Sequence, residues 1–298
     1  MTFNLAKINP IDLTGNVVTS NNRPFGSGNF ADVWEGIHTV QGYRYPVAVK
    51  ILRPSLLSDK HLKQKTKRKI LREAKVWSTL VHPNVARFIG VYYVQDTQGV
   101  PIPRLVSVFY RNRTLKDYLV NNPNNRESLR KLFRQFLSGL EYLHDKKVIH
   151  GDLKPTNVLI DNSWNAVLAD FGLSLVLDVS GFTTTNVKAV GTFRYMAPEL
   201  MNPPNPLVTP RPTAQSDIWS AGMTGLEILS GVVPYVDKIQ DGELIFCISK
   251  GDIPDRNRYD QVSSKTWSML KTCWCEAKAR PGVPTLIKSL NEIYPGLQ

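Results

Sequence analysis

The run His150-Gly151-Asp152-Leu153-Lys154-Pro155-Thr156-Asn157 is the most informative stretch of this 298-residue chain, and Asp170-Phe171-Gly172 follows shortly after it. The two runs supply a carboxylate that can accept a hydroxyl proton, a lysine, an amide oxygen and a second carboxylate. These groups form the set needed to transfer a phosphoryl group with two magnesium ions. A lone Asp-Phe-Gly would mean little, because tripeptides recur by chance. The prediction of phosphoryl transfer therefore depends on the other motifs that this chemistry requires and on their order along the chain.

A glycine-rich turn lies upstream, in Phe25-Gly26-Ser27-Gly28-Asn29-Phe30-Ala31-Asp32-Val33, between two stretches that read as strands, 16–20 and 33–38. Glycines at 26 and 28 let the backbone approach a triphosphate closely and present N–H groups to it. Taken alone, this pattern favours an ordinary hairpin, because Gly-x-Gly turns close many hairpins.

A lysine inside an apolar segment is the next feature. The β-branched run 46–51 is typical of a buried strand, and an unpaired ammonium group at Lys50 would be costly there. The segment 59–80 has helical periodicity and places Glu73 beside an apolar stripe. We therefore expect Glu73 to face inward and pair with Lys50. The alternative is that Glu73 pairs with Arg72, Lys69 or Lys75 on a solvated face.

Further motifs complete an ordered set, and the whole resembles the eukaryotic protein kinase domain from about residue 20 to 290. They are Gly191-Thr192-Phe193-Arg194-Tyr195-Met196-Ala197-Pro198-Glu199, Ser216-Asp217-Ile218-Trp219-Ser220-Ala221-Gly222 and Arg280-Pro281. The resemblance implies an α+β class and a bilobal protein kinase fold, with a β-rich N-lobe carrying one main helix and an α-rich C-lobe. It also implies an extension over 1–20, an N-lobe and hinge over 21–110, and a C-lobe over 111–298. Helices are predicted over 114–120, 126–145 and 216–229.

The same resemblance implies ATP and magnesium as cofactors, with a role for each matching residue. Lys50 would hold the α- and β-phosphates, and Glu73 would orient it. Asp152 would accept the substrate hydroxyl proton, and Lys154 would offset charge on the transferring phosphoryl group. The magnesium ligands would be Asn157 and Asp170. The other nucleotide-binding positions would be Gly26, Ser27, Gly28, Val33, Ala48, Ser107, Val108, Phe109, Tyr110 and Leu159.

Supporting contacts are also implied by the resemblance. Glu199 and Arg280 would form a structural ion pair, and Asp217 would cap the backbone of the catalytic loop. Trp77, His150 and Phe171 match positions that stack between the lobes of active family members.

The chain departs from the family at three positions. Ala31 replaces the third glycine of the phosphate loop, and Val108 stands where an acid is usual. Gly151 replaces an arginine that, in related enzymes, neutralises a phosphate on the activation loop. We therefore predict weak dependence on phosphorylation of that loop, at Thr183, Thr184 or Thr185. Another basic residue, such as Lys188 or Arg194, is the alternative receptor.

Two positions favour serine and threonine as acceptors. Lys154 resembles the serine/threonine class, and Thr192 suits it because its hydroxyl can bridge Asp152 and Lys154. The segments 82–85 and 273–281 resemble the tyrosine-kinase-like branch, whose members mostly act on serine and threonine. The predicted partners are accordingly protein substrates.

A rival interpretation is a pseudokinase scaffold that binds nucleotide without transferring phosphate, which the departures at Gly151, Ala31 and Val108 favour. The presence of every charged catalytic residue favours the enzyme. A small-molecule phosphotransferase of similar fold is a third alternative, but those enzymes generally lack the Ala-Pro-Glu and Asp-Ile-Trp-Ser motifs.

Composition bounds the remaining possibilities. Hydrophobic residues make up 42% of the chain, which is enough for a sizeable core. No apolar stretch is long enough to span a bilayer, and no secretory signal is expected at the start. The three cysteines favour free thiols in an intracellular, cytoplasmic protein over metal ligation by Cys273 and Cys275.

The formal net charge of +12 is concentrated in the helical segment 60–75. Such a basic face can recruit an acidic partner, or it can simply be solvated. No aromatic interleaving or nucleic-acid-binding module accompanies it, so no nucleic acid is predicted as a partner.

Overall fold

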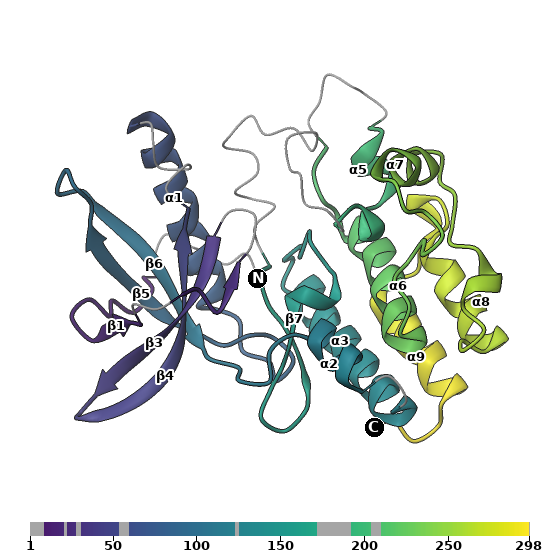
Figure 1. Cartoon of the computed structure of the whole chain (residues 1–298), viewed down its shortest axis with the longest axis horizontal. Helices are drawn as coiled ribbons and strands as arrows, with labels where there is room; N and C mark the ends of the chain where they lie inside the picture. Colours follow the sequence, from purple (N-terminus) through teal and green to yellow (C-terminus); the bar gives the residue numbers. More distant parts are fainter. Residues whose placement is uncertain are drawn as a thin grey trace. The chain divides into compact units, whose positions relative to one another are not determined.

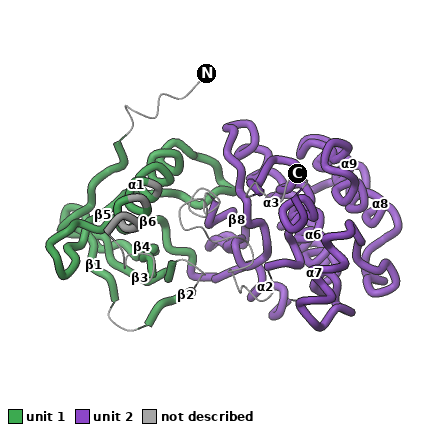
Figure 2. Tube along the Cα trace, turned by 90° about the horizontal axis from the view of Figure 1, so that it is seen from above, with its two compact units in different colours: residues 1–110, 175–182 green, residues 111–174, 183–298 purple. Residues whose placement is uncertain are grey.

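The computed structural model describes residues 9–20, 23–27, 31–53, 60–122, 125–171, 192–203 and 210–297, without the side chains of 60–63, 65 and 69. These residues form two compact units that meet in the sequence between Tyr110 and Arg111 (Figure 2). Strands dominate the first unit and helices dominate the second (Figure 1). The predicted α+β class is therefore confirmed.

The first unit is built on an antiparallel sheet with the order β1-β3-β4-β6-β5, to which β2 adds by pairing with β3. Alternate residues of these strands enter one apolar core, in which Val49 and Val106 are fully buried. The strands are β1 (Val17–Thr19), β2 (Gly26–Ser27), β3 (Ala31–Val40), β4 (Tyr43–Leu52), β5 (Phe88–Gln95) and β6 (Pro101–Val108).

The segment before β1 belongs to the same unit. The Leu13 N–H donates to the Val91 carbonyl at 2.7 Å, and the Val91 N–H donates to the Ile11 carbonyl at 2.8 Å. The side chain of Leu13 is buried in the sheet core. Residues 11–13 therefore run along β5 and extend the hydrogen bonding of the sheet.

One long helix, α1 (Lys60–Trp77), packs against β5 and β6. Its last residue is anchored, because the Trp77 indole N–H donates to the Ala86 carbonyl at 2.6 Å. The helix ends earlier than the predicted limit near Leu80. The hydroxyls of Ser78 and Thr79 bond to the carbonyls three residues earlier, which competes with continued helix formation.

The second unit surrounds a central helix, α6 (Ala214–Ser230), which is buried from Ser216 to Ile228. A capping box formed by Thr213 and Ser216 starts this helix two residues before the predicted limit. Gly225 allows close packing, since a Cβ there would lie 2.5 Å from the Phe133 ring. The other helices are α2 (Leu115–Asn121), α3 (Arg126–Asp145), α5 (Pro198–Met201), α7 (Asp241–Ser249), α8 (Ser264–Cys273) and α9 (Val283–Ile293).

A small two-stranded sheet completes the second unit. It consists of β7 (Val158–Ile160) and β8 (Ala166–Leu168), paired in antiparallel register, and β8 packs against α3. The 3-10 turn η3 (Pro155–Asn157) leads into β7. The sheet therefore fixes both segments that carry the predicted catalytic residues.

Candidate active site

The loop before η3 is held by a buried carboxylate on α6. Asp217 Oδ2 accepts from the His150 backbone N–H at 2.8 Å, and Oδ1 accepts from the Gly151 N–H at 2.8 Å. The ring Nε2 of His144 lies 2.9 Å from the same Oδ2. The side chain of Asp217 is 1% exposed, so these partners replace its hydration. The predicted capping of this loop by Asp217 is confirmed.

His150 connects the loop to the residue that precedes Asp170. Its imidazole is fully buried, and Nε2 lies 3.0 Å from the Ala169 carbonyl. Nδ1 accepts from the Asp152 N–H at 3.3 Å, which makes Nε2 the protonated nitrogen. Burial lowers the pKa of His150, against the opposing charges of nearby aspartates. A neutral ring therefore links the two segments.

The backbone at two positions adopts a left-handed conformation. Gly151 has φ of 78°, where a side chain would cost free energy, and Asp170 has φ of 57°, which aspartate tolerates better than most residues. The glycine that replaces the expected arginine thus removes backbone strain at its own position.

Two side chains, those of Lys154 and Asn157, contact the carboxylate of Asp152. Lys154 Nζ lies 2.8 Å from Asp152 Oδ2 and donates to Thr192 Oγ1 at 3.0 Å. The amide nitrogen of Asn157 donates to Asp152 Oδ2 at 2.8 Å and to the Asp152 carbonyl at 2.7 Å. The Thr192 hydroxyl was predicted to bridge Asp152 and Lys154, and its contact with Lys154 is observed. The amide nitrogen of Asn157 donates to Asp152. The amide oxygen of Asn157 is therefore the atom that can bind a cation.

The β7–β8 hairpin brings Asn157 and Asp170 together. Val158 pairs with Leu168, and the next bond of the ladder runs from the Ala169 N–H to the Asn157 carbonyl at 2.9 Å. Asp170 follows directly. An amide oxygen and a carboxylate are hard ligands of the kind that Mg²⁺ takes from proteins, with waters and phosphates completing its coordination. These residues therefore fit a magnesium site.

The predicted nucleotide-binding residues fall in both units. In the first unit, Lys50 Nζ lies 3.5 Å from Glu73 Oε1, and both side chains are nearly buried. The predicted pairing is confirmed over the solvated alternative. Lys50 on β4 lies opposite Val33 on β3, which in turn lies opposite Gly26 on β2. Gly28 lies outside the described residues, as do the threonines at 183–185.

The hinge segment belongs to the first unit as well. Ser107 pairs with Ala48, and the Val108 N–H donates to the Arg87 carbonyl at 3.0 Å. The Phe109 ring contacts the ring of Phe25, with centroids 4.8 Å apart. Since the N–H of Val108 is used within the sheet, its carbonyl is the backbone group that can contact a ligand.

The remaining predicted residues lie in the second unit. Leu159 is half-buried on β7, and the rings of His150 and Phe171 are 6.3 Å apart in an edge contact. The Arg280 guanidinium binds both oxygens of Glu199, at 2.5 and 2.9 Å. That predicted ion pair is confirmed.

Arg194 does not suit the role of an alternative phosphate receptor. Its guanidinium donates to the carbonyls of Pro234, Tyr235 and Lys238, at 2.8, 2.6 and 2.8 Å. These bonds fix the arginine to the loop that precedes α7. Lys188, the other candidate, lies outside the described residues.

A buried cluster around Glu227 on α6 was not predicted from the sequence. Lys116 Nζ on α2 lies 2.6 Å from Glu227 Oε1, and the Tyr195 hydroxyl donates to Oε2. Burial, aided by the glutamate charge, raises the pKa of Tyr195, so the phenol remains a donor. A glutamate within the most apolar stretch of the sequence was the available signal, because a buried carboxylate requires partners.

The cysteines are free thiols. Cys273 is buried, and this burial raises its pKa to about 12. Over the residues that the structure describes, no group of three or more His, Cys, Asp or Glu side chains is placed to hold a metal ion.

Residues 19–290 match the family model described as "Protein kinase domain". The chain belongs to the protein kinase domain family. The predicted fold class is thereby confirmed as that of a kinase domain, and the enzyme class agrees with the names of relatives.

Curated relatives of this kinase domain come from plants and animals. The chain is 33% identical to "Serine/threonine protein kinase OSK3" of Oryza sativa subsp. indica over 217 residues, covering 72% of the chain and 39% of the rice protein. It is 32% identical to "Probable L-type lectin-domain containing receptor kinase V.3" of Arabidopsis thaliana over 289 residues, covering 90% and 40%. It is 30% identical to "Receptor-interacting serine/threonine-protein kinase 1" of Homo sapiens over 242 residues, covering 76% and 34%.

The kinase domain therefore spans about two fifths or less of the length of these relatives. Within its described part, every helix is too short or too polar to cross a membrane.

Proposed function

We propose that this kinase domain transfers the γ-phosphate of ATP, in the presence of Mg²⁺, to serine and threonine hydroxyls of protein substrates. The observation that supports this best is the carboxylate of Asp152, oriented by Lys154 and Asn157 in a loop that Asp217 fixes. The names of the relatives agree with the acceptor class.

In this proposal Asp152 aligns the substrate hydroxyl and accepts its proton at the carboxylate. A hydroxyl has a pKa far above neutrality, so the proton moves late, once the oxygen is bonding to phosphorus. Lys154, 2.8 Å from Asp152, neutralises charge beside the transferring group, and Thr192 holds the lysine in place. Positioning and charge neutralisation account for most of such catalysis.

Asn157 and Asp170 are the proposed magnesium ligands, and Lys50 the proposed phosphate contact. Bound by Asn157 and Asp170, magnesium would supply positive charge that offsets the charge of the phosphates. Glu73 keeps the Lys50 ammonium oriented at 3.5 Å within an apolar strand. The hinge carbonyls and the backbone N–H groups of the phosphate loop, including those of Gly26, Ser27 and Gly28, would hold the rest of the nucleotide.

We further propose weak dependence on activation-loop phosphorylation and membership of the tyrosine-kinase-like branch. The weak dependence on phosphorylation is supported by the absence of an arginine at Gly151 and by the three carbonyls that Arg194 already binds.

We also propose domain limits of 1–20, 21–110 and 111–298. Free thiols support an intracellular, cytoplasmic location, and the basic segment 60–75 is a proposed site for an acidic partner.

Incorporation of labelled phosphate by the purified protein, with ATP and Mg²⁺, tests the enzyme assignment. Asp152→Asn should lower the rate by about 10²–10⁴-fold. Asp145→Asn, which makes the same chemical change at an exposed position on α3, should leave it unchanged. Equal incorporation by Asp152→Asn and the parent, or none by either, would support the pseudokinase scaffold instead. A second experiment, phosphorylation of a peptide library with serine, threonine and tyrosine acceptors, tests the acceptor class.

A further inference from the structure

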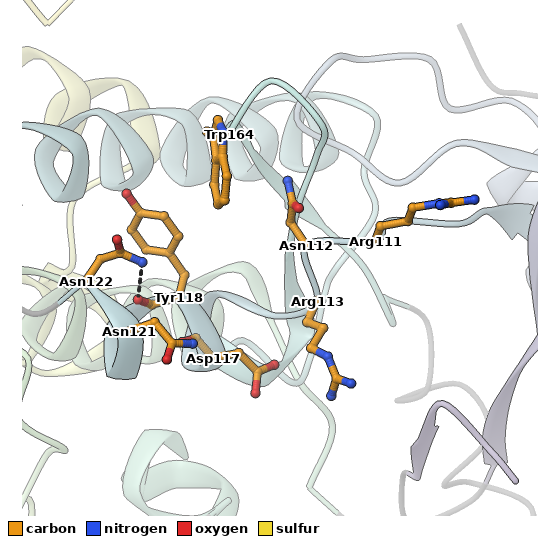
Figure 3. A pocket seen from close by; sticks show the side chains of 8 residues that line it. All are labelled: Arg111, Asn112, Arg113, Asp117, Tyr118, Asn121, Asn122 and Trp164. Carbon is orange, nitrogen blue, oxygen red and sulfur yellow. Dashed lines mark hydrogen bonds between the residues drawn. The ribbon is translucent and has the colours of Figure 1, made fainter.

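A polar pocket in the second unit has no part in the proposed catalysis. It has a volume of about 250 Å³ and lies between α2 and the turn that joins β7 to β8 (Figure 3). Arg111, Arg113, Tyr118 and Trp164 are the lining residues with the greatest capacity for recognition. Binding hot spots are enriched in these three residue types, arginine, tyrosine and tryptophan.

The tryptophan is held outward by a rigid turn. Trp164 is 57% exposed and has a positive φ of 62°, which is uncommon for a bulky residue. Asp161 Oδ1 accepts from the backbone N–H groups of Ser163 and Asn165, each at 2.8 Å. Gln135 on α3 donates to the Asn165 side chain at 2.6 Å, which ties the turn to the helix core. The indole is therefore presented without the entropic cost of ordering a loop on binding.

The opposite wall is equally fixed. Asn112 donates to the Asp161 carbonyl at 2.7 Å, and the Ile160 N–H donates to the Arg113 carbonyl at 3.0 Å. Arg113 also has a positive φ of 62°. Two non-glycine residues in this conformation thus line one pocket, and strained backbone of this kind concentrates at binding sites.

The charge presented by the pocket is positive. Asp117 is its acidic lining residue, and Asp117 Oδ2 accepts from the Thr114 N–H at 3.1 Å and from the Thr114 hydroxyl at 2.6 Å. That carboxylate is engaged in capping α2. Arg111 and Arg113 are both exposed, and Figure 3 shows their guanidinium groups extending away from the aromatic pair.

We propose that this pocket docks an acidic peptide segment of a partner protein, with an apolar side chain as anchor. The anchor would pack on Trp164 beside Tyr118, whose ring centroid lies 5.9 Å from that of the indole. A neighbouring carboxylate would pair with Arg111. The volume lies below the range of about 300–1,000 Å³ usual for small-molecule sites, so it suits one or two side chains better than a nucleotide.

Fluorescence anisotropy with a labelled peptide tests the proposal directly. The probe is a synthetic peptide with one leucine followed by three glutamates, flanked by glycine and serine. The parent protein should bind it saturably, and Trp164→Ala should weaken binding at least tenfold. Arg111→Glu should weaken it by a similar factor, whereas Lys265→Glu, the same charge reversal at an exposed site on α8, should change it less than twofold.

A second peptide with glutamine in place of glutamate controls for the anchor alone and should bind at least tenfold more weakly. Circular dichroism and phosphate incorporation should be unchanged in Trp164→Ala, which separates this proposal from the proposed enzymatic function. Absence of saturable binding, or equal binding by Trp164→Ala, overturns the docking site. Preferential binding of a single-stranded oligonucleotide over the acidic peptide would also overturn it.

Discussion

The ion pair between Lys116 on α2 and Glu227 on α6 allows a quantitative test of how the second unit is held together. Lys116→Met keeps most of the aliphatic stem but removes the ammonium, which lies 2.6 Å from Glu227 Oε1. Removing one partner of a buried pair costs about 3–5 kcal/mol, because the other charge remains buried. The Lys116 side chain is 40% exposed, so water can replace part of the interaction. We therefore expect a loss of about 2 kcal/mol in the free energy of unfolding, and a Tm lower by about 4–8 °C.

A double-mutant cycle isolates the pair. Glu227→Gln removes the buried charge while keeping an acceptor for the Tyr195 hydroxyl, and it should cost about 1 kcal/mol. In the Lys116→Met background the same change should cost almost nothing, because no uncompensated charge remains. The expected coupling energy is therefore about 1 kcal/mol.

Urea unfolding followed by tryptophan fluorescence and circular dichroism measures these differences, with Lys265→Met as an exposed control. Additivity of the two substitutions to within about 0.5 kcal/mol would refute the reasoning. So would a Lys116→Met variant as stable as the parent.

Three further substitutions probe the loop and its supports. Gly151→Ala should lower stability by about 1–2 kcal/mol, because φ is 78°, and an unchanged Tm would contradict this. Burial lowers the pKa of His150, so the unfolded chain protonates first as the pH falls. The free energy of unfolding should therefore decrease below about pH 6.5, by up to about 1.4 kcal/mol per pH unit, and His150→Gln should lose that part of the slope. Arg280→Met should cost about 3 kcal/mol in urea unfolding, because it leaves Glu199 without its bidentate partner; a cost similar to that of Lys278→Met would argue against the ion pair.

The parts of the molecule that the sequence predicts are those in which a local pattern and an ordered motif agree. The strand lysine at 50 and the inward-facing glutamate at 73 could be paired because a buried ammonium requires a carboxylate. The central helix was predicted to within two residues at its start, where a capping box rather than the apolar pattern sets the limit. The end of α1 was predicted too late, because hydroxyl groups at Ser78 and Thr79 compete for carbonyls that periodicity does not reveal.

Other features depend on long-range contacts or backbone angles and leave little trace in the sequence. Glu227 meets a lysine 111 residues earlier in the chain, and no local pattern specifies that partner. The sequence shows that Gly151 stands where the family has an arginine. It does not show that the backbone at Gly151 is left-handed, which only the fold reveals. The exposure of the Trp164 indole likewise depends on a turn that is hydrogen-bonded to Gln135 on α3.

The attachment of the catalytic loop to Asp217 has a consequence for how activity is lost on heating. Most of α6 is inaccessible to solvent, so the hydrogen bonds that position His150 and Gly151 break only when that helix separates from its neighbours. Segments of this kind open with free energies close to that of global unfolding. Thermal inactivation should thus coincide with cooperative melting of the second unit, with no earlier phase in which a folded enzyme carries a disordered loop.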